Sequence, residues 1–278
     1  MPSLTPGSVR DLLAAHGCRP SRALGQHFLA DPNLARKIVR LADVQPGDRV
    51  VEIGPGIGSL TVALAAAGAQ VVALELDRHL LPVLDEVLVD SGHRDDVTVV
   101  LGDALTADFR ALTGGGEWAC VSNLPYNVAT PMVMRLLEEF PEMSRCLVMV
   151  QREVGERLVA GPGTKAYGAV SVKVGYYAAA RMVGTVAATV FVPPPNVASA
   201  LVRLDRRPAP PVEVPSPDAL FALVRAGFGQ RRKMLRRALE PTLGDRTEAV
   251  LAAAGVDSSS RAEALTLEDW ARVCRAAA

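Results

Sequence analysis

The chain has 278 residues, of which 49% are hydrophobic and 22% charged, and its thirty Lys and Arg balance its thirty Asp and Glu. This composition is typical of globular proteins and excludes a disordered, collagen-like or coiled-coil chain. Because the formal net charge is zero, a nucleic-acid partner would have to be held by a local basic patch.

The four cysteines and the N-terminus indicate the compartment. No two cysteines form a C-x-x-C pair, which argues against zinc and against a disulfide framework and fits a reducing cytosol. The N-terminus lacks the regions of a signal peptide, and the uncharged run 60–74 is broken by Gly68 and Gln70. We expect a cytoplasmic protein with no bound metal and no membrane partner.

Short Val- and Ile-rich runs alternate with longer Ala- and Leu-rich runs between about Arg49 and Arg203. This alternation predicts an α/β fold with a parallel sheet and crossover helices. Asp31 and Pro32 are expected to begin a helix over 33–42, as N-cap and first helical residue. The expected strands are Arg49–Ile53, Gln70–Leu74, Val97–Leu101, Trp118–Ser122 and Cys146–Gln151, followed by an edge hairpin from Arg181–Thr189 and Ala198–Asp205.

Five prolines between Arg206 and Pro217 predict a linker. Beyond it the pattern is helical, with helix starts expected at Ser216 and at Thr266, which has Asp269 three residues on. The sequence therefore predicts a catalytic domain over 1–205 and a small all-α domain over 206–278. The first carries a net charge of −3 and the second +3. No long apolar stripe remains after this division, so a monomer is expected.

A glycine-rich loop follows the first expected strand, with Gly54, Gly56 and Gly58 at alternate positions. Glycines let the backbone turn sharply and approach a ligand, and Glu75, at the end of the second strand, can accept both hydroxyls of a ribose. NAD-binding folds share this layout, but the dinucleotide fingerprint would place its third small residue at Ser59. With Glu52 ahead of the loop, the pattern resembles S-adenosylmethionine-dependent methyltransferases.

Asn123, Leu124, Pro125 and Tyr126 follow the fourth expected strand, at the edge of the sheet where such folds bind ligands. An adenine amine is a poor nucleophile because its lone pair is delocalised into the ring. The Asn123 carbonyl and a backbone carbonyl beside Pro125 can accept the amine hydrogens and favour the sp³ nitrogen, while Tyr126 can stack on the base. An Asn turn followed by a core tyrosine is the structural alternative.

Together these motifs resemble the ribosomal RNA adenine N6,N6-dimethyltransferases over nearly the whole chain. The similarity is greatest to the bacterial members that modify two adjacent adenosines in the hairpin loop near the 3′ end of 16S rRNA. One departure is His27, where the family often has Asn. The matching positions are Leu24–Leu29, the glycine loop, Glu75, Asp103, Asn123–Tyr126, Phe191–Ala200 and Ala226–Lys233.

The resemblance implies a Rossmann-like class I methyltransferase sheet and a role for each matching residue. His27 and Leu29 would contact S-adenosylmethionine, Gly54 and Gly56 would line its methionine end, and Glu75 would bind its ribose. Asp103, on its own a candidate helix N-cap, would reach the adenine of the cofactor. Asn123 would touch both the cofactor and the target amine. Phe191 would close over the flipped target adenine, although a Phe among prolines can instead anchor its loop in the core.

Six basic residues and no acidic ones lie between Ala219 and Leu239. They are Arg225, Arg231, Arg232, Lys233, Arg236 and Arg237. Such a run can be a solvated helix face, but an enzyme acting on folded RNA must hold it by its phosphates. We expect these residues to bind 16S rRNA by shape, within an immature small ribosomal subunit.

Three other functions remain open. A 23S rRNA adenine methyltransferase of the antibiotic-resistance type would share every cofactor residue, although the Asn-Leu-Pro-Tyr motif and the long basic helical domain favour the 16S enzyme. A nicotinamide-dependent oxidoreductase would bind NAD. A non-catalytic assembly or transcription factor would keep the fold without the activity, yet all the candidate catalytic residues are present.

Overall fold

The computed structural model describes residues 4–278, so the first three residues of the expected catalytic domain lie outside it. The chain forms two compact units, one from residues 4–155 and 181–206 and the other from 156–180 and 207–278. The break after Arg206 lies one residue from the expected boundary. The segment 156–180, expected in the catalytic domain, instead belongs to the helical unit because Tyr167 and Tyr176 pack in that unit's core.

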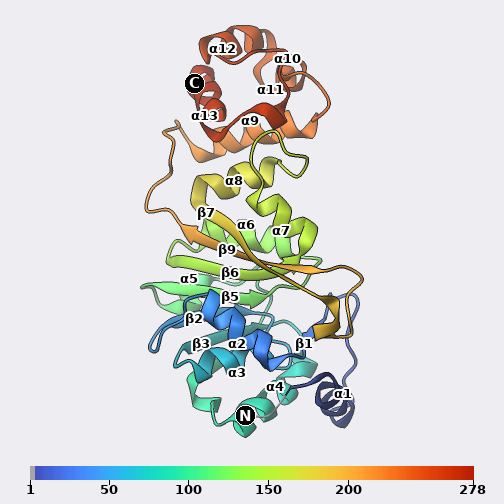
Figure 1. Cartoon of the computed structure of the whole chain (residues 1–278). Helices are drawn as coiled ribbons and strands as arrows, with labels where there is room; N and C mark the ends of the chain where they lie inside the picture. The colour runs from blue at the N-terminus through green and yellow to red at the C-terminus, as the bar shows by residue number, and fades with distance from the viewer. Residues whose placement is uncertain (1–3) are drawn as a thin grey trace. The chain divides into compact units, whose positions relative to one another are not determined.

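The first unit contains the sheet (Figure 1). Its helices are α1 (Pro6–Ala15), α2 (Pro32–Leu41), α3 (Ser59–Ala66), α4 (Leu81–Ser91), α5 (Phe109–Thr113) and α6 (Ala129–Glu139), and α7 (Arg152–Val159) begins in it. Its strands are β1 (Phe28–Leu29), β2 (Arg49–Ile53), β3 (Gln70–Glu75), β4 (Val97–Leu101), β5 (Trp118–Asn123), β6 (Met143–Gln151), β7 (Ala178–Val186), β8 (Phe191–Val192) and β9 (Ser199–Arg206). The first three residues of β7 belong to the other unit.

Seven strands form the main sheet in the order β4-β3-β2-β5-β6-β9-β7. The first five are parallel to one another, and β9 runs antiparallel to β6. The strand order reverses between β2 and β5. After β2 the chain adds β3 and β4 on one side of it, and then crosses to the other side of β2 to form β5. Open α/β sheets bind ligands at the carboxyl ends of the strands beside such a switch point.

The five expected parallel strands are all present. β2 and β4 have the expected bounds, β3 and β5 each extend one residue further, and β6 begins three residues earlier at Met143. The predicted helix start is also confirmed, because the Asp31 carboxylate accepts hydrogen bonds from the backbone N–H groups of Asn33 and Leu34. These elements place β2, β3 and β5 with their carboxyl ends on one edge.

The edge strands differ from the expected hairpin. β9 and β7 are neighbours at the edge, but β8 and a proline-rich loop lie between them in the chain. β8 pairs with β1 in a separate two-stranded antiparallel sheet, in which Phe28 faces Val192 and Leu29 faces Phe191. This pairing brings the N-terminal segment to the proline-rich loop, and a two-residue strand such as β1 has no periodicity that would predict it.

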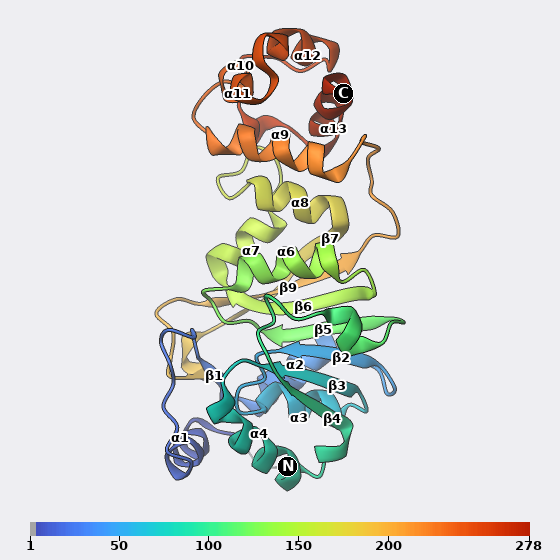
Figure 2. The ribbon, with the colours of Figure 1, turned by 180° about the vertical axis from the view of Figure 1, so that it is seen from behind.

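Helices cover both faces of the main sheet. Figures 1 and 2 show α2 and α3 on one face and α6 on the other. Most of α3 is buried, from Leu60 to Ala65, and it lies directly after the glycine loop. The buried side chains of β2 (Val50, Val51 and Ile53) therefore have apolar partners on both sides, as parallel strands require.

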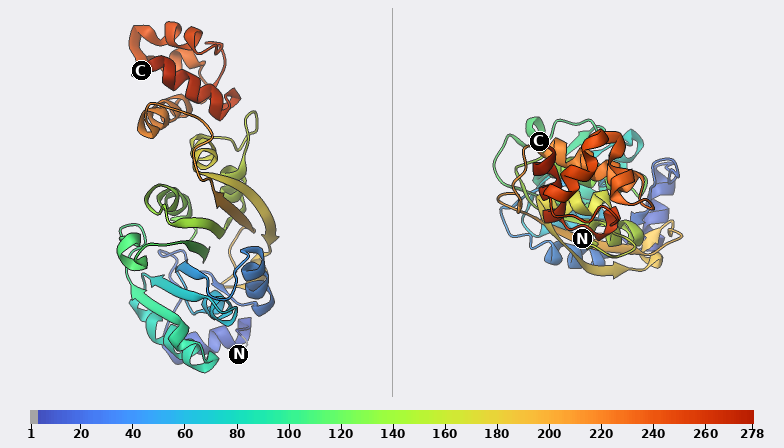
Figure 3. Two further views of the ribbon diagram at one scale, coloured as in Figure 1. Left: turned by 90° about the vertical axis from the view of Figure 1, so that its left-hand side faces the viewer. Right: turned by 90° about the horizontal axis from the view of Figure 1, so that it is seen from above.

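The second unit is helical (Figure 3). It contains α8 (Ala169–Tyr177), α9 (Pro217–Gly229), α10 (Leu235–Ala238), α11 (Glu240–Leu243), α12 (Thr247–Ala253) and α13 (Leu267–Ala277). The expected caps Ser216 and Thr266 are confirmed. Trp270 is fully buried against α9, where a Cβ on Gly227 would lie 2.5 Å from the indole ring, so only glycine fits. Within residues 4–278, none of the helices has the length and apolarity needed to cross a membrane.

Candidate functional site

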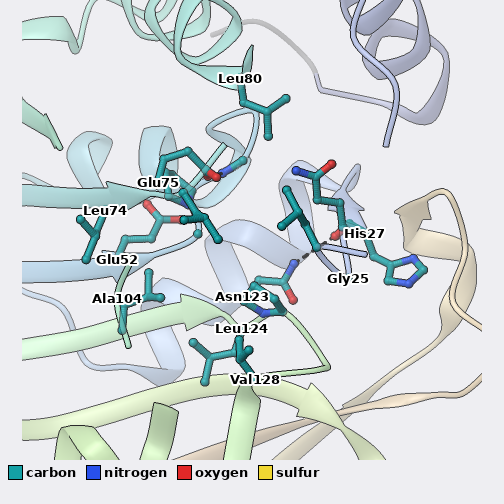
Figure 4. Close-up of a pocket in the computed structure, with 18 of the residues that line it drawn as sticks. Gly25, His27, Glu52, Leu74, Glu75, Leu80, Ala104, Asn123, Leu124 and Val128 are labelled. Atoms are coloured by element: carbon teal, nitrogen blue, oxygen red, sulfur yellow. Dashed lines mark hydrogen bonds between the residues drawn. The ribbon is translucent and has the colours of Figure 1, made fainter. Parts of the chain in front are cut away.

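A pocket in the first unit lies at the carboxyl ends of β2, β3, β4 and β5 (Figure 4). It brings together nearly all the candidate site residues predicted in this unit. The selected residues that line it are His27, Leu29, Gly54, Gly56, Glu75, Asp103, Asn123, Leu124, Pro125 and Tyr126. Phe191 is the exception among the selected residues of this unit.

The glycine turn after β2 forms one wall of this pocket. Gly54 and Gly56 have φ angles of +68° and +59°, in the left-handed region that residues with a Cβ rarely adopt. A Cβ on Gly56 would also lie 3.0 Å from the Phe28 ring. The turn therefore requires glycine for its conformation and for the close approach of β1, and it leads directly into α3 at Ser59.

Glu75 fixes this turn from the end of β3. Its Oε2 accepts a hydrogen bond from the Gly56 N–H at 2.9 Å, and its Oε1 accepts one from the Asp77 N–H at 2.8 Å. Burial raises the pKa of Glu75, and these two hydrogen bonds oppose that shift. Because each carboxylate oxygen has two lone pairs, both oxygens can still accept a hydroxyl.

Glu52 on β2 is a second buried carboxyl in the pocket, and it is 1% exposed. Its Oε2 makes no hydrogen bond within the described part of the chain. Burial, opposed by the Thr61 side chain and assisted by the neighbouring negative charge of Glu75, raises the pKa of Glu52 to about 8, so the Glu52 side chain is mainly protonated at pH 7. From the sequence, Glu52 was predicted only as part of the loop pattern, although its place two residues before Gly54 was a signal for a site residue.

Asn123 at the end of β5 has a fixed amide orientation. Its Nδ2 donates to the backbone carbonyl of His27 at 3.1 Å, and a carbonyl can only accept, so Oδ1 must face the other way. Oδ1 is buried and has no hydrogen-bond partner among residues 4–278. A buried carbonyl left unpaired is costly, so a ligand that donates a hydrogen bond here would gain more than at an exposed site.

The turn after Asn123 places Leu124, Pro125 and Tyr126. Leu124 is buried, and the Pro125 carbonyl accepts from the Val128 N–H in the turn that leads into α6. The Tyr126 ring stacks on the His27 ring, and its hydroxyl is hydrogen-bonded to Ser199. Burial raises the pKa of Tyr126, with the Ser199 bond opposing it, so the phenol remains neutral at pH 7. The Tyr126 side chain is thus partly buried and fixed in place, by the His27 ring against its face and by Ser199 at its hydroxyl.

Two further polar residues, Asp103 and Gln26, line the pocket. Asp103 lines it and accepts a hydrogen bond from the Leu105 N–H at 2.8 Å, so it makes the local turn contact expected of a capping residue. Gln26 accepts from the Ser21 N–H and donates to Asp77 at 2.9 Å. The sequence analysis did not single out Gln26, whose partner lies 51 residues away. This bond fastens the N-terminal segment next to Glu75.

The expectation that Phe191 closes over a target base is wrong for this structure. Phe191 is 2% exposed and lies in the main hydrophobic core, where its backbone pairs with Leu29. The β1–β8 pairing turns the ring into the core, so Phe191 anchors the proline-rich loop. This outcome is the alternative that the sequence left open.

The basic run in the second unit divides into two kinds of residue. Arg225, Arg232, Lys233, Arg236 and Arg237 are exposed, as expected of residues that could contact phosphates. Arg231 instead donates to Glu263 at 2.8 Å and to the Lys165 carbonyl at 2.8 Å. These bonds join segments of the helical unit, so Arg231 has a structural role that the charge pattern did not indicate.

The pocket combines a backbone turn, two buried carboxyl groups, an unpaired amide carbonyl and an aromatic ring. Across the described residues, no group of three or more His, Cys, Asp or Glu could hold a metal ion. The arrangement is suited to an organic ligand bound at the glycine turn and Glu75, with a planar base presented to Asn123 and Tyr126.

Comparison with known proteins agrees with this arrangement. A statistical model of the family described as "Ribosomal RNA adenine dimethylase" matches residues 19–278. The chain is 49% identical over 276 residues to a protein of Thermobifida fusca named "Ribosomal RNA small subunit methyltransferase A", covering 97% of this chain and 94% of that protein. A Streptomyces coelicolor protein of the same name is 46% identical, with 97% and 95% covered.

Two solved structures are similar over most of the chain. A dimethyladenosine transferase from Plasmodium falciparum has a TM-score of 0.73 and 23% identity, with 89% of this chain and 96% of that chain covered. The 23S rRNA methyltransferase ErmE has a TM-score of 0.69 and 28% identity, with 90% and 98% covered. The fold is the Rossmann-like class I methyltransferase fold, and the chain belongs to the ribosomal RNA adenine dimethylase family of methyltransferases.

Proposed function

We propose that this chain transfers methyl groups from S-adenosylmethionine to the N6 amines of two adjacent adenosines in the hairpin loop near the 3′ end of 16S rRNA. The buried, unpaired Oδ1 of Asn123 beside the glycine turn carries the proposal. The substrate would be an immature small ribosomal subunit, and the enzyme would act as a monomer in the cytoplasm.

The pocket fits this cofactor. Two oxygens of Glu75 can each accept a ribose hydroxyl while keeping their bonds to Gly56 and Asp77, and Asp103 lies where it can meet the adenine end. Gly54 and Gly56 line the pocket where the methionine end would lie, on a turn whose φ angles require glycine. When bound, S-adenosylmethionine would supply a methyl group activated by its positively charged sulfur.

The protein's own contribution is to prepare the adenine amine. Asn123 Oδ1 would accept one amine hydrogen, and this bond strengthens as the nitrogen becomes sp³ and its lone pair leaves the ring. Because the amide is held by the His27 carbonyl, it needs no reorientation when the base arrives. Tyr126 offers its ring for stacking, and its neutral phenol remains bonded to Ser199.

The relatives favour 16S over 23S rRNA. The proteins at 46% and 49% identity are named for the small subunit, whereas the 23S rRNA methyltransferase ErmE is 28% identical. The test is to incubate the purified chain with labelled S-adenosylmethionine and ribosomal particles that lack both modifications, and then to map the methylated nucleotides. We expect two dimethylated adjacent adenosines in 16S rRNA. Methylation of 23S rRNA alone would establish the rival function, and no methylation would overturn both.

Replacing Glu75 should weaken cofactor binding. Glu75→Ala removes the acceptor of two ribose hydroxyls, each such bond being worth about 1.5–3 kcal/mol, and it frees the Gly56 N–H. We expect the dissociation constant for S-adenosylmethionine, measured by calorimetry, to rise at least tenfold. Asp90→Ala on the exposed face of α4 is the control and should leave it unchanged. If Glu75→Ala and the wild type bind S-adenosylmethionine equally well, Glu75 does not bind the cofactor.

Replacing Asn123 should separate chemistry from binding. Its carbonyl contact is stronger in the transition state than in the ground state, so Asn123→Ala should lower the single-turnover rate at saturating cofactor by about 10²–10³-fold. Affinity for the small subunit should barely change. A near wild-type rate under these conditions would mean that Asn123 only completes a turn.

Removing exposed charge from the basic run should weaken RNA binding. Each phosphate contact contributes about one unit to the dependence of log affinity on log salt, so Arg232→Ala combined with Lys233→Ala should lower this slope by up to about two units. The control pair, Lys37→Ala with Arg40→Ala, removes the same charge from the exposed side of α2. Equal effects of the two pairs on binding to small subunits would show that only net charge matters.

A further inference from the structure

The His27 side chain lies on a different side of the pocket from the one expected for a cofactor contact. Figure 4 shows its ring pointing away from Leu74 and Glu75, toward the segment that follows β8. Only its backbone carbonyl points inward, where it accepts the Asn123 bond. The ring therefore faces the start of the proline-rich loop rather than Glu75.

The ring has two defined partners. Its centroid lies 5.3 Å from that of Tyr126 with the planes 30° apart, which is a stacked pair. Its Nδ1 lies 2.7 Å from the Pro193 carbonyl, and because that oxygen can only accept, Nδ1 is the protonated nitrogen. His27 thus joins the Asn123–Tyr126 turn to the start of the proline-rich loop.

The same pair also holds the far end of that loop. The Tyr126 hydroxyl is hydrogen-bonded to Ser199, the first residue of β9. The loop over 193–199 is consequently tied at Pro193 by the His27 ring and at Ser199 by the Tyr126 ring, while the β1–β8 pairing fixes the backbone just before Pro193. With Phe191 in the core, His27 and Tyr126 are rings that contact the two ends of this loop.

We propose that His27 is a positioning residue, which holds the Tyr126 ring and the 193–199 loop in the arrangement that receives the target adenine. An Asn at this position could donate to Pro193 but could not stack on Tyr126, and a Phe could stack but not donate. The two interactions can therefore be separated by substitution. This inference rests on the proposed function, because it assumes that an adenine stacks on Tyr126.

The test compares His27→Ala, His27→Phe and His27→Asn on immature small subunits. We expect His27→Ala to lower the single-turnover rate at saturating S-adenosylmethionine by about tenfold, the size of one aromatic pair and one hydrogen bond together. The dissociation constant for the cofactor should stay within about twofold of wild type. His27→Phe should recover most of the rate and His27→Asn a smaller part. His93→Ala, on a surface loop outside the pocket, is the control and should match wild type.

Several results would overturn the inference. A weakened cofactor affinity with an unchanged rate at saturation would make His27 a cofactor contact. Wild-type rates for all three variants, or a His27→Phe rate as low as that of His27→Ala, would remove the stacking role. If His27→Ala does not fold, as judged by its thermal unfolding midpoint, His27→Phe and His27→Asn supply the comparison. A wild-type enzyme that methylates no adenosine would instead refute the proposed function.

Discussion

The site depends on one hydrogen bond, from Asn123 Nδ2 to the backbone carbonyl of His27. It fixes the amide with its nitrogen toward the N-terminal segment and leaves Oδ1 buried, with no hydrogen-bond partner among residues 4–278. A folded protein seldom retains such an atom, because an unpaired buried carbonyl costs about 1–3 kcal/mol. The arrangement persists because β5 fixes one end of this bond and the β1–β8 pairing fixes the other. Preorganisation of the acceptor is thus a consequence of the fold.

The two glutamates near the glycine turn show how different surroundings give identical side chains different protonation behaviour. Glu75 receives two backbone N–H bonds that favour its charged form, whereas Glu52 has an oxygen without a hydrogen-bond partner in the described part of the chain and is shifted to a pKa of about 8. The pocket therefore presents one carboxyl whose charged form is stabilised by two backbone donors and a second that is largely neutral at pH 7. A ligand that brings positive charge near Glu52 would favour its ionisation.

The sequence predicted those strands, helix caps and site residues whose positions depend on neighbouring residues in the chain. The Val-rich runs gave the parallel strands to within a few residues, and Asp31, Ser216 and Thr266 cap their helices as expected. The glycine loop, Glu75 and Asn123 could be selected because their chemistry needs those residue types after successive strands. The roles of three residues could not be predicted, because each depends on a partner far away in the chain. Phe191 pairs with β1, Arg231 bonds to Glu263, and Gln26 bonds to Asp77. The grouping of 156–180 with the helical unit likewise depends on packing that has no local signal.

The central claim is that the free carbonyl of Asn123 receives the adenine amine. The most direct measurement is a crystal structure of the chain with S-adenosylhomocysteine and an RNA hairpin that carries the two target adenosines. The account predicts that the N6 atom of one adenosine lies within hydrogen-bond distance of Asn123 Oδ1, that Nδ2 keeps its bond to the His27 carbonyl, and that the base stacks on Tyr126. An adenosine whose N6 atom meets other groups, with Oδ1 of Asn123 still unpaired, would contradict it.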